Sequence, residues 1–408
     1  LRNTEYRSRV QKLVQSAFAG KPEDIISQSV AKALYGEVSP YSATRLERFA
    51  ACAFAHFLQY GMKLTERVEV AAIEDRPQAM TAALERIAPS VDLIVTTGAV
   101  SVGKKDIMHE ALESFAEEVR KRGMKWTELT EQERNEIADR CLDNIVADYG
   151  NTVLKSSARN EYMIERTRRI LRRTVWALQK QLEQGEFQPE GFEVTFGGGR
   201  IDRVDIMEDQ NKVYVKVIDY KTGNTSFDLV YLYHGLLMIY LDGALRVEQK
   251  KYPDKEIIPA GVFYYNIKDP MIQEKIDADV EAVSAGLMKE LKMNGLVQAD
   301  PELVYRMDSS LGSIPVAFNK DGSFRKNSSV ADRTQFAVLG RYVRTKIEKI
   351  RSSILEGDAE VSPYELGKKN ACTYCPYMTV CGFDRRLSGY EFRRLKNFSD
   401  EELWKAFD

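Results

Sequence analysis

The stretches GRIDRVD (residues 199–205) and VKVIDYKTG (residues 215–223) decide how this chain folds. Both alternate apolar and polar residues, and a short EDQN turn separates them, so they predict two neighbouring antiparallel strands. The second strand ends in an acid and a base, Asp219 and Lys221. Side chains two residues apart in a strand share a face, so we expect both to point to one side and Tyr220 to the other.

The first strand offers two acids, Asp202 and Asp205, and a hairpin brings one of them beside Asp219. Two carboxylates that meet at a strand end form a site for a hard cation such as Mg²⁺ or Mn²⁺. Beside that cation, Lys221 orients or deprotonates a water and offsets the charge that builds up on a phosphate. The pattern predicts phosphodiester hydrolysis, and the alternative is a plain ion pair before a turn.

This pair of strands resembles the core of PD-(D/E)XK nucleases, in their RecB-like branch. The resemblance implies an α/β fold with a small central mixed sheet and many surrounding helices. It implies that Asp202 and Asp219 bind metal and catalyse with Lys221, and that the backbone carbonyl of Tyr220 is a further ligand. The upstream stretch HEALESF matches the histidine of that branch, which makes His109 a metal ligand.

The same branch has a tyrosine on the helix after the lysine, with a glutamine four residues earlier. Tyr240 matches the tyrosine and is expected to position the substrate, but Leu236 stands in place of the glutamine. This departure leaves a second interpretation open, in which the chain is a catalytically impaired scaffold that binds DNA.

Three cysteines follow the core in ACTYCPYMTVC, where Cys372, Cys375 and Cys381 are spaced C-x2-C-x5-C. Such close thiols are typical of a metal site, with Cys52 or Cys141 as the fourth ligand. The run RLERFAACAFAHFLQYG around Cys52 resembles AddB-type nucleases, which have one cysteine before the core and three after it. The resemblance implies a 4Fe–4S cluster that staples the N- and C-terminal parts together, and zinc is the alternative.

The organisation follows from helical and strand patterns, which together predict an α/β fold. A helix begins near Ser42, where Thr44 and Glu47 have the spacing of a capping box, and Thr130 and Glu133 repeat that spacing. Further helices are predicted at 107–122, 160–185 and 228–245, and a further strand at 257–266. The expected parts are a helical lead at 1–38, the nuclease domain at 39–395 and a tail at 396–408.

Residues 74–106 interrupt the resemblance and are interpreted as an inserted segment. The run TTGAVSVG at 96–103 resembles the substrate loop of MoeA-like molybdopterin-binding domains. It also approaches a phosphate-binding loop, but Lys105 stands where a serine or threonine would hold magnesium. We expect the segment either to leave the site intact or to misplace His109.

The net charge is −2, so any contact with DNA depends on local basic patches. Arg169 and Arg173 lie along one predicted helix face, and Arg325 and Lys326 follow later in the chain. These four are predicted to track a DNA backbone, and solvated surface is the alternative.

The resemblance to AddB-type nucleases also implies a partner and a substrate. Such proteins cleave single-stranded DNA at double-strand breaks, as heterodimers with an AddA-type helicase–nuclease subunit. Because residue 1 is a leucine, we expect a fragment of a longer chain. No signal peptide and no apolar run of membrane-spanning length is visible, so we expect a cytoplasmic protein that does not act in a membrane.

Overall fold

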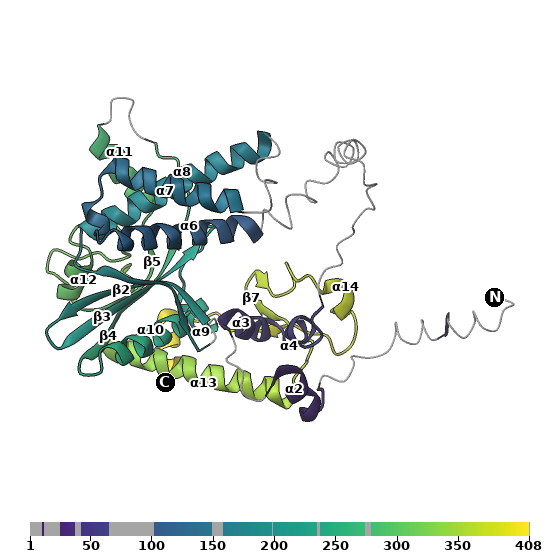
Figure 1. The fold of residues 1–408 in the computed structure, drawn as a ribbon. Coiled ribbons are helices and arrows are strands. Elements are labelled where there is room, and N and C mark those ends of the chain that lie inside the picture. The colour runs from purple at the N-terminus through teal and green to yellow at the C-terminus, as the bar shows by residue number, and fades with distance from the viewer. Residues whose placement is uncertain are drawn as a thin grey trace, which may run out of the picture.

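The computed structural model describes residues 10–11, 25–36, 42–64, 102–148, 158–197, 199–234, 237–273 and 279–407. In this part of the chain a six-stranded sheet lies between two layers of helices (Figure 1). The α/β class and the central mixed sheet are therefore confirmed. No helix of these residues is long and apolar enough to cross a membrane.

The strands of the sheet lie in chain order. They are β1 (Gln188–Phe196), β2 (Gly199–Asp209), β3 (Lys212–Lys221), β4 (Glu256–Asn266), β5 (Asn294–Gln298) and β6 (Val330–Ala331). The first three are antiparallel, as predicted, and β4 runs parallel to β3. β5 is antiparallel to β4, and β6 is parallel to β5; neither was predicted, because both are short.

Helices cover both faces of the sheet. One layer holds α6 (Val102–Lys121), α7 (Glu131–Asp148) and α8 (Ala158–Glu183). The other holds α2 (Gln28–Tyr35), α3 (Ala43–Ala51), α9 (Leu229–His234), α10 (Met238–Lys251), α13 (Arg333–Glu356) and α15 (Asp400–Phe407). The shorter helices are α4 (Ala53–His56), η1 (Phe57–Gly61), η3 (Trp126–Glu128), α11 (Val280–Glu290), α12 (Pro301–Met307) and α14 (Met378–Cys381). A small second sheet contains β7 (Tyr364–Leu366), β8 (Lys369–Asn370) and β9 (Arg393–Arg394).

Local signals located the helix starts well but missed two breaks. Thr130 and Glu133 form the expected cap of α7. At α3 the hydroxyl of Ser42, and not that of Thr44, accepts the capping hydrogen bond. The helix predicted from Ser42 to Gly61 is interrupted at Cys52, which is extended (φ −165°, ψ 120°). The helix predicted at 228–245 is likewise two helices, α9 and α10.

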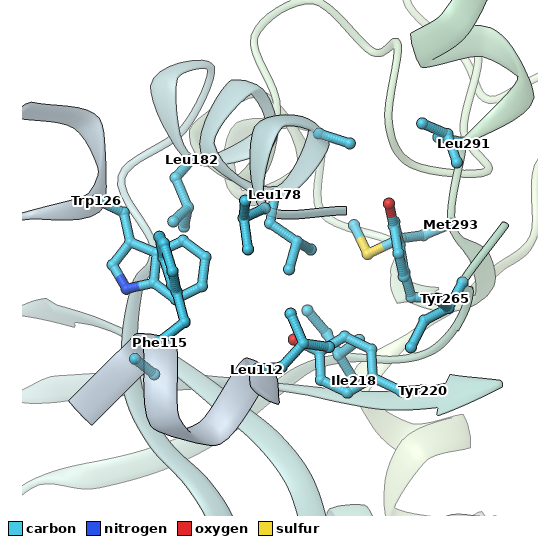
Figure 2. Packing of buried hydrophobic residues seen from close by; sticks show 14 of the residues in the cluster. Leu112, Phe115, Trp126, Leu178, Leu182, Ile218, Tyr220, Tyr265, Leu291 and Met293 are labelled. Atoms are coloured by element: carbon cyan, nitrogen blue, oxygen red, sulfur yellow. The ribbon is translucent and has the colours of Figure 1, made fainter. Parts of the chain in front are cut away.

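Two hydrophobic cores lie on opposite faces of the sheet, and β3 contributes to both. Ile218 and Tyr220 face the core under α6 and α8, whereas Val215 and Val217 face the core under α10 and α13. Figure 2 shows Tyr220 and Ile218 against Leu112 of α6 in the first core. Burying each such side chain contributes about 1.5–3 kcal/mol, so the face on which β3 places each residue is strongly fixed. Tyr220 therefore points away from the face of Asp219, as predicted.

A buried polar cluster decides which acid of β2 is left for the site. Asp205 is 0% exposed and accepts hydrogen bonds from Nε of Arg203 at 2.5 Å and from its Nη2 at 2.9 Å. Nζ of Lys216 lies 3.0 Å away from Oδ2 of Asp205. Burial opposes ionisation, but the two cations still lower the pKa of Asp205. Breaking such a buried pair costs about 3–5 kcal/mol, so Asp205 is held in the core.

Candidate active site

Asp202, Asp219 and Lys221 meet at one end of β2 and β3, as the sequence predicted. Arg203 pairs with Ile218 across the two strands, so the next residues outward, Asp202 and Asp219, stand on adjacent strands. Nζ of Lys221 lies 2.5 Å from Oδ2 of Asp219. An acid, a second acid and a base therefore share one strand end.

The helix α6 adds His109 to these acids. Nδ1 of His109 lies 3.8 Å from Oδ2 of Asp202, and the backbone N–H of Tyr220 donates to the same Oδ2 at 2.6 Å. Nε2 of His109 is buried without a hydrogen-bond partner. The Tyr220 ring meets the imidazole edge-on at 5.9 Å between centroids and so fixes its orientation. The His109 helix is thus in place at the acidic strand ends.

Glu193 is a site residue that the sequence did not reveal. Its Oε1 lies 3.6 Å from Nδ1 of His109, and one ligand atom each of His109, Glu193 and Asp202 lies within 4.8 Å of the others. Glu193 has φ +50°, a left-handed conformation rare for this residue type. This residue reverses the alternation of β1, because Phe192 packs on one core and Val194 on the other. Strand irregularities of this kind re-aim side chains near active sites.

The acids lie in a cleft of about 1210 Å³. Its carboxylates are Glu47, Glu110, Glu113, Glu193, Asp202 and Asp219. The cations that line it are Arg200 and Lys221, and Arg200 forms an ion pair with Glu193. Burial and then the charge of Asp219 raise the pKa of Asp202 to about 7. This concentration of negative charge suits a divalent cation and repels a bare phosphate.

Tyr240 lines the same cleft from α10, as predicted for a residue that positions the substrate. Its ring meets Phe196 edge-on at 6.1 Å between centroids. Burial raises the pKa of Tyr240, so the phenol stays protonated and able to donate a hydrogen bond. Leu236, which stands where the branch has glutamine, lies outside the described residues.

The predicted DNA-binding cations lie elsewhere. Arg169, Arg173, Arg325 and Lys326 are not among the residues that line the cleft. Nε of Arg169 lies 2.5 Å from Asp269, and the same carboxylate is 3.9 Å from Arg173. Nε of Arg325 donates to a backbone carbonyl at 2.9 Å. These side chains remain a prediction for DNA contact outside the cleft.

The four predicted cluster cysteines gather in one place. Cys52, Cys372, Cys375 and Cys381 line a common pocket, together with apolar residues such as Phe54 and Val361. Burial, followed by the three other thiols, raises the pKa of Cys372 to about 11. Neutral thiols so close together, in apolar surroundings, fit a metal centre that binds them as thiolates.

The fifth cysteine, Cys141, lies apart from that pocket. It is 5% exposed in the core under α6 and α8. The four pocket cysteines are thus the ones that the AddB-type resemblance selects, and Cys141 is an ordinary core residue.

Backbone contacts also join the two ends of the described chain near this pocket. Figure 1 shows α3 and α4 beside the C-terminal β7 and α14. The N–H of Ile26 donates to Gly357 O at 2.9 Å, and the N–H of Phe54 donates to Glu360 O at 3.0 Å. Gly357 has φ +90°, and a Cβ there would lie 2.0 Å from Ile26 O, so only glycine permits this approach.

The inserted segment lies mostly outside the described residues. Of 74–106, only residues from 102 onward are described, as the first turn of α6. Val102 and Gly103, from the molybdopterin-like run, thus belong to the helix that positions His109, five residues before the predicted start. The expectation that the segment misplaces His109 is therefore wrong.

Comparison with known families places this geometry. The profile of the PD-(D/E)XK nuclease superfamily matches residues 40–382. This chain belongs to that superfamily. The match spans both the acidic cleft and the cysteine pocket, from Cys52 to Cys381. The resemblance predicted from GRIDRVD and VIDYKTG is confirmed.

Several relatives are named as one subunit of an ATP-dependent helicase/deoxyribonuclease, the subunit of AddB type. The one from Lachnoclostridium phytofermentans is 39% identical over 427 residues, covering 98% of this chain and 34% of that protein. The one from a Thermoanaerobacter species is 31% identical over 426 residues, covering 98% and 35%. The one from Clostridium acetobutylicum is 32% identical over 412 residues, covering 94% and 33%. The chain therefore spans about a third of the length of these PD-(D/E)XK relatives.

Proposed function

We propose that this PD-(D/E)XK chain is the nuclease part of the AddB-type subunit of an ATP-dependent helicase/deoxyribonuclease and hydrolyses single-stranded DNA. The observation that carries the proposal is the meeting of His109, Asp202, Asp219 and Lys221 in one cleft. The names of the relatives supply the biological setting, processing of double-strand breaks for recombinational repair.

The cleft residues take separate roles in the proposed reaction. His109, Asp202 and Asp219, with the carbonyl of Tyr220, would hold Mg²⁺ or Mn²⁺, and Glu193 is close enough to join them. When bound, the cation supplies a Lewis acid for a phosphate oxygen and lowers the pKa of a water. Lys221 holds the attacking water in line and offsets negative charge that develops on the phosphate.

The scaffold interpretation is not favoured. It rested on the missing glutamine and on the inserted segment, yet His109 lies 3.8 Å from Asp202 and Lys221 lies 2.5 Å from Asp219. A site that had lost its function would not need to keep two carboxylates, a histidine and a lysine together in a buried, mutually repelling arrangement.

A 4Fe–4S cluster on Cys52, Cys372, Cys375 and Cys381 is part of the proposal. When bound, the cluster supplies a rigid cross-link between segments that are far apart in sequence. We further propose an AddA-type helicase–nuclease partner and a cytoplasmic location, because the relatives are named as subunits of a helicase–nuclease.

A cleavage assay tests the proposed activity. The 408-residue chain, purified without oxygen, is mixed with labelled single-stranded DNA in Mg²⁺ or in EDTA. We expect cleavage in Mg²⁺ and none in EDTA. Retained DNA binding without cleavage in Mg²⁺ or Mn²⁺ would favour the scaffold instead.

The raised pKa of Asp202 predicts how cation binding depends on pH. Burial and Asp219 raise this pKa to about 7, so below that pH a cation must displace a proton. We expect Mg²⁺ affinity to rise with pH and level off above about 7, with proton release on the acid side. Without metal, the folded protein keeps a proton that unfolded Asp has lost, so its stability falls as pH rises between the unfolded value of 3.8 and about 7.

Thermal unfolding in graded Mg²⁺ measures this dependence. The gain in Tm on adding Mg²⁺ should be larger at about pH 8 than at about pH 6. An equal gain at both values would show that no proton is displaced at Asp202.

Glu193 is expected to contribute to cation binding. Glu193→Gln keeps the shape of the side chain and removes its charge, so the Mg²⁺ concentration for half-maximal cleavage should rise about tenfold. Glu110→Gln is the matched control, because Glu110 lines the same cleft but is not in the three-residue group. An equal rise in both variants would assign the effect to the general field of the cleft.

A further inference from the structure

A second groove continues from the active cleft. It has a volume of about 630 Å³ and lies between the end of β1, α10 and α13. Thr195, Phe196 and Gly197 line both the groove and the cleft, so the two are continuous at this turn. Gly243 of α10 allows the junction, because a Cβ there would lie 2.3 Å from the Phe196 ring.

The charge of this groove is opposite to that of the cleft. Its cations are Arg246, Lys250, Arg344 and Arg351, against the two acids Asp242 and Glu348. The cleft has six carboxylates against Arg200 and Lys221. A polyanion is therefore repelled by the metal-free cleft and attracted by the groove next to it.

One buried acid holds two of these cations in place. Oδ2 of Asp242 lies 2.9 Å from Nη2 of Arg246, and its Oδ1 accepts from Nη1 of Arg344 at 2.5 Å. The Asp242 side chain is 14% exposed, whereas those of Arg246 and Arg344 are 63% and 43% exposed. The shared carboxylate thus fixes both guanidinium groups while each keeps donors open to solvent, an arrangement suited to phosphate oxygens.

The floor of the groove is apolar. Leu46, Phe196, Ile239, Val247 and Ile347 line it, and the ring of Phe196 is only partly buried. Such a floor accepts the faces of unpaired bases, while the cations above it contact the sugar–phosphate chain. A duplex keeps its bases stacked inside and offers nothing to this floor.

We propose that this groove, lined by Arg246, Lys250 and Arg344, is a subsite for single-stranded DNA next to the scissile phosphate. It rests on the proposed function of the cleft and adds to it. The groove holds the strand by charge and base contact, and the strand then turns over Phe196 into the cleft. The strand is therefore bound even when the acidic cleft has no cation to bridge it.

The test is DNA binding in EDTA, where the cleft repels the strand. Labelled single-stranded oligonucleotide is titrated with the parent and with Arg246→Glu, Lys250→Glu. We expect the pair to raise Kd at least tenfold and to reduce the slope of log Kd against log salt by about 1.4, at roughly 0.7 per phosphate contact. The control, Lys349→Glu with Lys289→Glu, makes the same change in net charge at exposed positions outside the groove and should keep Kd within about twofold.

The outcomes separate this inference from the proposed function. If the parent cuts DNA in Mg²⁺ but the groove pair binds as well as the control pair, the groove is not a subsite and the nuclease proposal stands. If the groove pair loses binding while the parent fails to cut, the subsite stands and the nuclease proposal falls. A parent that prefers duplex in EDTA overturns the subsite. If the reversed pair has a lowered Tm, Arg246→Gln with Lys250→Gln replaces it, and an unchanged salt slope then overturns the subsite.

Discussion

Lys221→Ala is expected to lower the cleavage rate of saturating single-stranded DNA by about a thousandfold, the range found for a group that stabilises charge or moves a proton in the transition state. Nζ of Lys221 lies 2.5 Å from Asp219, and 5.3 Å from the centre of the Tyr264 ring. These contacts fix the ammonium group at the strand end. The side chain is 31% exposed, so the truncation removes charge without leaving a cavity in the core.

Lys212→Ala is the matched control for this prediction. Lys212 begins the same strand at its far end and is exposed. Its removal changes net charge equally, so it should leave cleavage within about twofold and Tm unchanged. The readout is single-turnover cleavage in Mg²⁺ together with DNA binding in EDTA, which Lys221→Ala should preserve. A Lys221→Ala protein that keeps more than about a tenth of the parent rate would remove Lys221 from the chemistry.

The sequence predicted the catalytic strand end because its information is local. Asp202 and Asp219 follow from two adjacent strands, a short turn and a period of two, and the observed register brings them side by side. The residues alone left Asp202 and Asp205 as alternatives. Only burial separates them, because Arg203 and Lys216 pair with Asp205 inside the core.

Glu193 could not be predicted from the same pattern. Phe192 and Val194 have the spacing of one strand face, and simple alternation would place them together. The structure puts them on opposite cores, because Glu193 adopts φ +50° between them. A single left-handed residue leaves no mark in composition or spacing, and it is held by packing on both sides. The break at Cys52 is similar, since a run of helix-forming residues surrounds it.

The cysteine pocket acts on the cleft through α3. Ser42, Ala43, Thr44 and Glu47 belong to this helix or its cap, and all line the active cleft. Cys52 ends the same helix and lies in the pocket with the C-terminal cysteines. A cross-link at Cys52 therefore holds one wall of the active cleft, so the proposed cluster serves catalysis by position.

Cys375→Ala is expected to remove the iron and to lower Tm by about 10 °C, because losing a structural metal centre costs several kcal/mol and each corresponds to roughly 2 °C or more in a chain of this size. Cleavage should fall with it, since the wall made by α3 is no longer held. Cys141→Ala is the control, because Cys141 is equally a buried thiol but lies in the core under α6. It should keep the full iron and sulfide content and cost about 1 kcal/mol. Iron and sulfide analysis with thermal unfolding decides the matter. Unchanged iron in Cys375→Ala would contradict the ligand set, and zinc in the parent would contradict the 4Fe–4S assignment while leaving the cross-link in place.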